Sequence, residues 1–163
     1  MKIALGCDHR GFAAKQELLP LLKSMGYRTE DFGCDSALGV DYPDIAYPLA
    51  VAVASQQCHL GIMIDCNGMG MSMVANKVHG VRAATVCDEI TARSARENYH
   101  CNIIGIGVDL VGGKDIHKIV EVFLLATVGA GRHARRVEKL RGVEEMVAQA
   151  YAANHNPPLA SLV

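Results

Sequence analysis

Short apolar runs alternate with segments whose apolar residues recur at helical spacing over the first 127 residues of the chain. The short runs predict strands at residues 2–6, 27–32, 59–64, 81–86 and 102–106, and the segments between them predict helices at residues 12–25, 44–55, 69–78, 88–98 and 114–127. Runs such as Gly61-Ile62-Met63-Ile64 are apolar on both faces, which is typical of parallel strands covered on both sides. We therefore expect an α/β fold, a three-layer αβα sandwich around a five-stranded parallel sheet.

In such Rossmann-like sheets, ligands bind beyond the carboxyl ends of the strands. Three polar clusters stand at the ends of predicted strands, namely Cys7-Asp8-His9, Asp65-Cys66-Asn67 and Cys87-Asp88. We therefore expect the functional site at this edge of the sheet.

The most informative strand end lies within residues 62–72, where an apolar strand passes through a glycine-rich turn into a helix. A strand that ends in this way presents backbone N–H groups and a helix N-terminus, which suit a phosphate or a developing oxyanion. Asp65 and Cys66 are reactive side chains directly beside this anion cradle. The run therefore predicts the floor of a catalytic site.

The first strand ends in Asp8-His9-Arg10-Gly11. A carboxylate next to an imidazole can orient a sugar hydroxyl, move a proton or bind phosphate. In the alternative interpretation, Asp8 caps the following helix and His9 is a surface residue. Gly6 and Gly11 lack the spacing of a dinucleotide fingerprint and no acidic ribose anchor accompanies them, so a dinucleotide site is not indicated.

The region after Gly129 predicts a long amphipathic helix that begins at Arg132. No further strand is predicted for this helix to cover, so we expect it to pack on its own domain or on a partner subunit. The tail around Pro157 breaks it. The apolar residues of its stripe are Val137, Leu140, Val143, Met146, Val147 and Ala150.

Four basic residues gather at the start of that helix, where cations oppose the helix dipole: Arg132, His133, Arg135 and Arg136. Such a cluster requires an anionic partner, and the guanidinium fork matches the oxygens of a phosphate group. The alternative is a solvated basic face. A metal centre is not indicated, because no group of His, Cys and Asp residues has zinc spacing.

The composition narrows the class of partner. The 163 residues suffice for one domain with a substantial core, and a formal net charge of −1 with interspersed signs argues against a nucleic-acid or membrane surface. No segment approaches the roughly 20 apolar residues of a membrane span, and the N-terminus lacks a signal-peptide core. We therefore expect a cytoplasmic protein that binds a small anionic ligand, with its six scattered cysteines as free thiols.

Taken in order, these motifs resemble the family of ribose-5-phosphate isomerase type B and galactose-6-phosphate isomerase. The resemblance implies the αβα fold, an isomerase domain over residues 1–145, and a helix end and tail over residues 146–163. It also implies no metal or organic cofactor, and a homodimer or dimer of dimers whose active sites draw on both subunits. The residues that carry it are Gly6-Cys7-Asp8-His9-Arg10-Gly11, Asp41-Tyr42-Pro43, the Gly68-x-Gly70 turn with Ala75-Asn76-Lys77, Gly80-Val81-Arg82-Ala83, Asn102-Ile103-Ile104-Gly105-Ile106-Gly107, and Gly131-Arg132-His133 with Arg136-Val137.

The family reaction interconverts an aldose phosphate and a ketose phosphate through a cis-enediolate, while backbone N–H groups hold the charge on oxygen. By resemblance, the catalytic candidates are Asp65, Cys66, Asn98 and His100. The sugar is contacted by Asp8, His9 and Tyr42, and the phosphate by Arg132 and Arg136. The resemblance also places Tyr99 in the substrate site, and the anion hole is lined by Asn67, Gly68, Met69, Gly70 and Ser72.

The sequence departs from the family pattern in three regions. Asp65 stands where many members have a catalytic Cys, as in the A subunit of galactose-6-phosphate isomerase, and neither Met71 nor Ser72 offers the glutamate of other members. Asn98 replaces the ring-opening His, with Tyr99 in place of Asn and His100 two residues on. Asp109 replaces an Arg that in several members adds to the phosphate site.

These departures leave three functions open. The leading one is an aldose–ketose isomerase with Asp65 as the base, acting on ribose 5-phosphate or on a tetrose 4-phosphate. A tetrose 4-phosphate cannot close a furanose, because its O4 is esterified, and so needs no ring-opening His. The others are a non-catalytic subunit that completes a partner's site and a sugar-phosphate sensor.

Overall fold

The computed structural model describes residues 1–111 and 113–154 of the chain. In that part, five parallel strands form one sheet, as the sequence predicts, and the structure places them in the order β2-β1-β3-β5-β4. The strands are β1 (Lys2–Cys7), β2 (Arg28–Asp31), β3 (Leu60–Asp65), β4 (Ala83–Val86) and β5 (Ile103–Gly107).

The helices begin and end within a few residues of the predicted positions. Gly26, with φ +81°, follows the first of them in the left-handed conformation that glycine tolerates at a helix end. The fourth begins with a capping box, in which Asp88 accepts a hydrogen bond from the Thr91 N–H. The helices are α1 (Phe12–Ser24), α2 (Tyr42–Ala54), α3 (Met69–Ala75), α4 (Glu89–Tyr99), α5 (Gly113–Leu125) and α6 (Arg132–Asn154).

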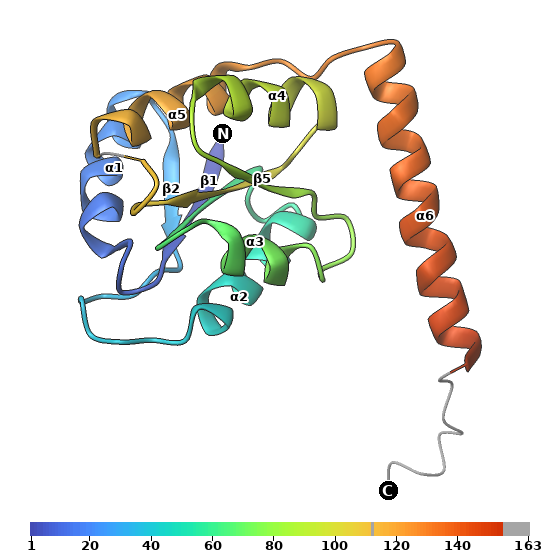
Figure 1. Ribbon diagram of the computed structural model, residues 1–163, viewed down its shortest axis with the longest axis horizontal. Helices are drawn as coiled ribbons and strands as arrows, with labels where there is room; N and C mark the ends of the chain where they lie inside the picture. The colour runs from blue at the N-terminus through green and yellow to red at the C-terminus, as the bar shows by residue number, and fades with distance from the viewer. Residues whose placement is uncertain (112, 155–163) are drawn as a thin grey trace, which may run out of the picture.

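The sheet separates two apolar cores, which makes the three layers visible in Figure 1. On one face, Leu18 of α1, Ala92 of α4 and Phe123 of α5 pack over the odd-numbered apolar residues of β1. On the other face, Leu49 of α2 and Met71 of α3 pack over Met63 and Ala4. Because β3 is buried on both faces, its residues are apolar without alternation until Asp65.

The topology places a switch point at the carboxyl ends of β1 and β3. From β1 the chain crosses to β2 on one side of the sheet, and β3 pairs with β1 on the other side. The helix after β1 lies on one face and the helix after β3 on the opposite face. Such a switch point is where open α/β sheets bind ligands.

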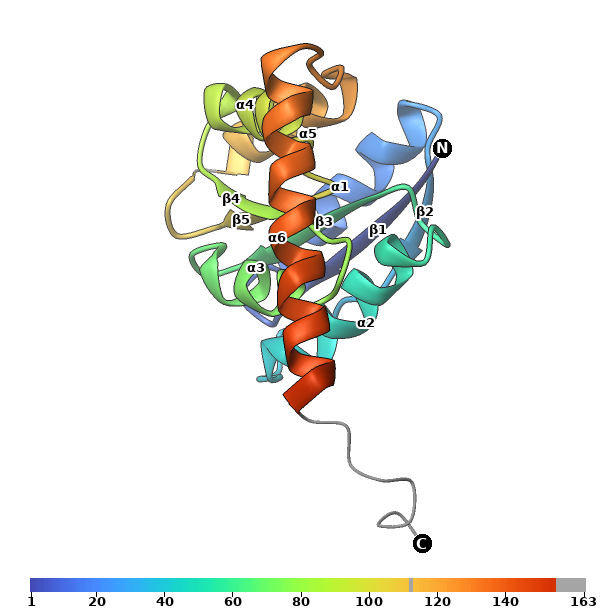
Figure 2. The ribbon, with the colours of Figure 1, turned by 90° about the vertical axis from the view of Figure 1, so that its right-hand side faces the viewer.

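Helix α6 runs along the side of the sandwich and stands apart from it (Figures 1 and 2). Val137 is only 8% exposed, whereas Leu140, Val143, Met146 and Val147 are at least half exposed. The predicted apolar stripe is therefore present and mostly uncovered. The helix continues unbroken through residue 145, and residues 155–163 lie outside the described part of the chain.

Within the described residues, no helix is both long enough and apolar enough to cross a membrane.

Candidate active site

Asp65 ends the central strand and holds the glycine-rich turn with its carboxylate. Its Oδ1 accepts hydrogen bonds from the N–H groups of Asn67, at 2.9 Å, and of Gly68, and its Oδ2 accepts one from the Met71 N–H at 3.2 Å. The side chain is 3% exposed. The turn is thus built around a carboxylate, and Oδ2, with one long hydrogen bond, is the oxygen with spare acceptor capacity.

The same contacts occupy part of the predicted anion hole. The Asn67 and Gly68 amides point to Asp65, and the Met69 N–H donates to the Asn67 side chain at 3.0 Å. Hence these three amides are engaged within the chain. Among the five residues predicted to line the hole, the Gly70 amide carries no such contact in the described structure. The anion-binding role of all five stays a prediction.

The turn approaches β5 closely because two glycines allow it. Gly68 has φ +75°, and a Cβ there would meet the Gly105 carbonyl oxygen at 2.9 Å. The Gly68 carbonyl in turn accepts hydrogen bonds from the Ser72 and Thr85 hydroxyls, at 2.7 and 2.8 Å. Ser72 is 5% exposed, so its hydroxyl holds the Gly68 carbonyl from the buried side of the turn. Thr85 is a contributor that sequence reasoning missed, since nothing in β4 marks it before the sheet places β4 beside β5.

Asp8 and Tyr42 flank this turn from β1 and α2. Asp8 is 6% exposed, and its Oδ1 accepts hydrogen bonds from the N–H groups of Arg10 and Gly11 at 2.8 and 3.2 Å. These contacts hold the turn that precedes α1. The helix itself has Gly11 as its N-cap and no side-chain capping hydrogen bond, so the alternative interpretation of Asp8 as a helix cap is wrong. The Tyr42 ring lies against Gly70, where an added Cβ would come within 3.0 Å of it.

His9 and Arg10 extend the site toward its neighbouring loops. The Nδ1 atom of His9 accepts a hydrogen bond from the Val40 N–H at 3.4 Å, so the imidazole contacts the loop before α2. Arg10 forms an ion pair with Asp109 at 2.6 Å, and the Asp109 N–H donates to the Cys66 carbonyl at 3.0 Å. This ion pair joins the loops after β1 and β5, the two neighbours of β3. The pairing of Arg10 with Asp109 was not predicted from the sequence, because 99 positions separate the two residues.

The two cysteines near the site differ in environment. Cys66 is partly exposed just beyond the end of β3. Cys7 is buried beside Cys34 with the two sulfurs 3.7 Å apart, and burial, with the neighbouring Cys34, raises the pKa of the Cys7 thiol to about 12. Cys7 is therefore a protonated core residue below the site at neutral pH.

Lys15 fixes the loop that follows β2, and its role was not anticipated from the sequence. Although its side chain is 1% exposed, its Nζ lies 2.8 Å from the Asp31 carboxylate and donates to the Cys34 carbonyl at 2.9 Å. The only signal in the sequence is its position on the apolar side of α1, which alone does not predict a buried ammonium group.

A second group of predicted site residues surrounds a cavity of about 370 Å³ between α4 and α6. Asn98 and Tyr99 line it from the end of α4, and Arg132 and Arg136 line it from the first turns of α6. Both arginines are exposed. His100 is not among the lining residues, because its Nε2 contacts the Gly129 carbonyl at 2.8 Å.

The two groups lie at opposite edges of the sheet. Helix α4 begins after the carboxyl end of β4 and returns the chain to the start of β5, so its last residues lie at the amino edge. The segment before α6 is fastened there, since the Gly129 N–H donates to the Glu97 carbonyl at 2.8 Å. Asp8, Asp65 and the turn lie at the carboxyl edge. One chain therefore does not bring its arginine pair to its own Asp65.

Comparison with known proteins is consistent across sequence and structure. Residues 3–140 match the family model described as Ribose/Galactose Isomerase. Ribose-5-phosphate isomerase B of Escherichia coli is 37% identical over 144 residues, which cover 88% of this chain and 97% of the relative.

Two solved structures have the same fold. A ribose-5-phosphate isomerase B from Clostridium thermocellum superposes with a TM-score of 0.87 at 41% identity, covering 90% of this chain and 99% of the other. The enzyme of Mycoplasma genitalium, solved with bound ribulose 5-phosphate, superposes with a TM-score of 0.85 at 36% identity, covering 88% and 96%.

Proposed function

This chain belongs to the ribose/galactose isomerase family, and from that premise we propose that it interconverts the aldose and ketose forms of a small sugar phosphate. Its similarity to ribose-5-phosphate isomerases B over nearly their whole length makes ribose 5-phosphate and ribulose 5-phosphate the leading substrate pair. The single observation that carries the proposal is the carboxylate of Asp65 within the glycine-rich turn at the switch point of the sheet.

The isomerisation requires a base that moves one proton between C2 and C1 of the sugar. The C2–H bond breaks, its electron pair forms the C1=C2 double bond, and the carbonyl oxygen takes the negative charge. Return of the proton to C1, with transfer of the O2 proton to O1, gives the ketose. No redox cofactor enters this balance, because C1 is reduced as C2 is oxidised.

We assign the proton transfer to Asp65 rather than to Cys66. Neighbouring strand residues point to opposite faces, so one of the two faces the turn, and the carboxylate of Asp65 does so. Substrate must displace or share the long hydrogen bond from Met71 to reach Oδ2.

Arg132 and Arg136 are proposed to bind the phosphate, with Asn98 and Tyr99 beside them. The cavity of about 370 Å³ is large enough for a phosphate group, and guanidinium groups bind its oxygens in pairs. His9, which follows β1 at the carboxyl edge of the sheet, is proposed to assist phosphate binding from the other subunit. His100, turned to the Gly129 carbonyl, is proposed to support the end of α4 rather than to touch substrate.

Because the two groups lie at opposite edges of one chain, we propose that each active site is completed by a second copy of the chain. An apolar groove between α6 and the edge strand β4 supports this proposal. It has a volume of about 970 Å³ and is lined by Val81 and Ala84 on one side and by Leu140, Val143 and Val147 on the other. A homodimer, or a dimer of dimers, would cover the apolar stripe of α6 that is exposed here.

The six free thiols fit a protein of the reducing cytoplasm, where we propose that it acts.

Asn98 bears on the number of carbon atoms in the substrate, because it stands where a ring-opening group is expected. An amide cannot exchange protons as an imidazole does, so ring opening of a furanose has no acid–base group at this position. A tetrose 4-phosphate avoids that step and is the second candidate. A subunit that completes a partner's site, without turnover of its own, is the third.

The test is proton exchange by the purified full-length chain alone. Tetrose 4-, ribose 5- and galactose 6-phosphates are incubated in D₂O, and NMR follows deuterium at C1 and C2. Exchange with any of them, abolished in Asp65→Asn and largely retained in Cys66→Ala, supports the assignment. Exchange lost only in Cys66→Ala moves the base to the thiol, and no exchange with any sugar phosphate refutes autonomous catalysis.

A further inference from the structure

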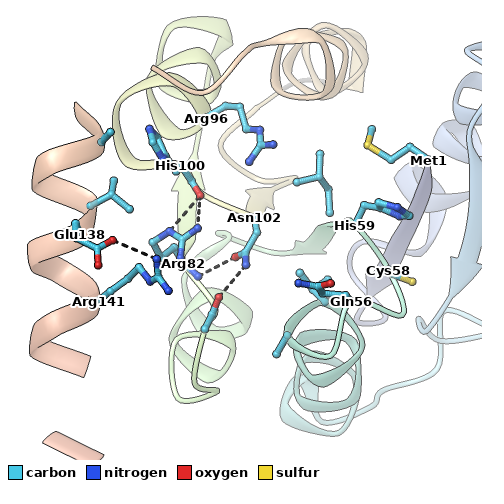
Figure 3. A pocket seen from close by; sticks show the side chains of 16 residues that line it. Met1, Gln56, Cys58, His59, Arg82, Arg96, His100, Asn102, Glu138 and Arg141 are labelled. Atoms are coloured by element: carbon cyan, nitrogen blue, oxygen red, sulfur yellow. Dashed lines mark hydrogen bonds and ion pairs between the residues drawn. The ribbon is translucent and has the colours of Figure 1, made fainter. Parts of the chain in front are cut away.

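A second polar cavity, of about 770 Å³, opens at the amino edge of the sheet between the sandwich and α6 (Figure 3). It is bordered by residues that precede or begin β3, β4 and β5, and by one face of α6. Its volume falls in the range of small-molecule sites. The charged and polar side chains at its wall include His59, Arg82, Arg96, Asn102, Glu138 and Arg141.

The wall carries an excess of positive charge. Glu138 is the one carboxylate among the lining residues, and its Oε2 lies 3.2 Å from Arg141, which it neutralises. Throughout residues 1–111 and 113–154, excluding the side chains of 113–115 and 154, no carboxylate forms an ion pair with Arg82 or Arg96. Two guanidinium charges therefore face this cavity without a counterion among the described side chains.

The contacts of these two arginines leave most of their N–H groups available. Arg82 donates from Nε and Nη2 to the His100 carbonyl at 3.1 and 2.8 Å, and Arg96 donates from Nη1 to the Cys101 carbonyl at 3.0 Å. A guanidinium group has five N–H donors. The carbonyl groups at the end of α4 are thus capped, but they are neutral and engage a minority of the donors.

The two arginines also repel each other. Burial, together with the nearby charge of Arg82, lowers the pKa of the Arg96 guanidinium from its usual value. A bound dianion would remove this repulsion and occupy the free donors of both side chains at once.

We propose that this cavity is a second binding site, specific for the phosphate group of a small phosphorylated metabolite. A phosphate monoester carries about −1.5 to −2 charges at neutral pH, which matches two unpaired guanidinium groups. The space toward His59 and Gln56 takes the organic part of the ligand.

This site is separate from the candidate active site. Asp65 and its turn lie at the carboxyl ends of the strands, whereas this cavity lies at their amino ends. The cavity that holds Arg132 and Arg136 lies at the same edge, but Val137 is the one lining residue that the two cavities share. Of the proposed site's four residues on α6, Ala134, Glu138 and Arg141 lie on a face of the helix different from that of Leu140 and Val143, and the buried Val137 lies between the two faces. A second copy seated on the apolar stripe would therefore leave the cavity's own helix face uncovered.

The test uses the full-length double variant Arg132→Gln/Arg136→Gln, which lacks the candidate substrate phosphate site. Inorganic phosphate and ribose 5-phosphate are titrated into it by calorimetry. We expect one ligand per chain. Adding Arg96→Gln should weaken the affinity by at least about tenfold, because a charge-assisted contact is lost. Arg93→Gln is the matched control, because Arg93 lies on the same helix, is exposed and pairs with Glu97.

Arg141→Gln keeps the proposal testable if Arg96→Gln does not fold. Arg141 is exposed on α6, and its loss frees the Glu138 carboxylate at the cavity wall, so affinity should fall several-fold. Tighter binding of ribose 5-phosphate than of inorganic phosphate supports a phosphorylated metabolite, and binding of inorganic phosphate alone overturns that part. No binding to the double variant, or binding indifferent to Arg96 and Arg141, overturns the site.

Discussion

Subunit complementation tests whether one active site is assembled from two copies of the chain. One variant carries Asp65→Asn, which removes the proposed base at the carboxyl edge. The other carries Arg132→Ala and Arg136→Ala, which remove the proposed phosphate ligands at the amino edge. Each variant alone has every site damaged, whichever way the sites are built.

The expected magnitudes follow from the geometry. Each arginine contributes about 1.5–3 kcal/mol to substrate affinity as a charge-assisted hydrogen bond, so the double variant should lose about two to four orders of magnitude in kcat/KM. In a mixed dimer, one site receives Asp65 from one chain and both arginines from the other, and is intact. The second site receives neither, so the mixed dimer should have about half the activity of the native dimer.

The assay co-expresses the two variants with different affinity tags, purifies the mixed dimer over both, and measures isomerisation per dimer. The control pairs Asp65→Asn with Asp8→Asn. Because both residues lie at the same edge, every site of that mixed dimer is damaged and activity should not return. A mixed dimer of the first pair that is no more active than its parents would refute a site shared between subunits.

Three further changes test the packing and electrostatics around the site. Lys15→Met should lower the free energy of unfolding by about 2–4 kcal/mol in urea titrations, because it removes a buried donor from Asp31, whose side chain is 37% exposed, and from a loop carbonyl. The control Lys23→Met, at an exposed position, should change it by less than about 0.5 kcal/mol, and a loss under about 1 kcal/mol for Lys15→Met would contradict the argument. Gly68→Ala should cost about 2–4 kcal/mol, because alanine is strained at φ +75° and its Cβ would press on a carbonyl of β5, and an unchanged melting temperature would oppose this. Burial raises the pKa of the Cys101 thiol from 9.0 to about 11. Between these values the unfolded chain loses a proton that the folded chain keeps, so stability falls as pH rises. Cys101→Ala should reduce this slope of stability against pH between pH 9 and 11, and an identical slope in the variant would contradict the prediction.

The layered fold was predictable because its signal is local. Uninterrupted apolar residues in β3 can be satisfied only where both faces of a strand are covered, and the helices between strands carry their own spacing and end signals. The glycine-rich turn after Asp65 was likewise marked in the sequence, since glycine at positive φ and a strand-to-helix junction leave a recognisable pattern.

The contacts within the site were not predictable from the same signals. That Asp65 engages the turn's own amides, that Thr85 supports the Gly68 carbonyl and that Arg10 pairs with Asp109 all depend on which strands become neighbours. None of these pairs has a spacing that distinguishes it from chance in one sequence.

The sequence by itself determined the succession of strands and helices along the chain, the turn at the end of β3 and the apolar stripe of α6, because periodicity and turn chemistry act over a few residues. Tertiary structure alone decided that the arginines of α6 and the carboxylate of Asp65 lie at opposite edges of the sheet. It also decided that Arg82 and Arg96 line one cavity in which no described carboxylate pairs with either of them. Both arrangements arise from the direction in which each crossover helix returns the chain, a property of the assembled sheet rather than of any segment.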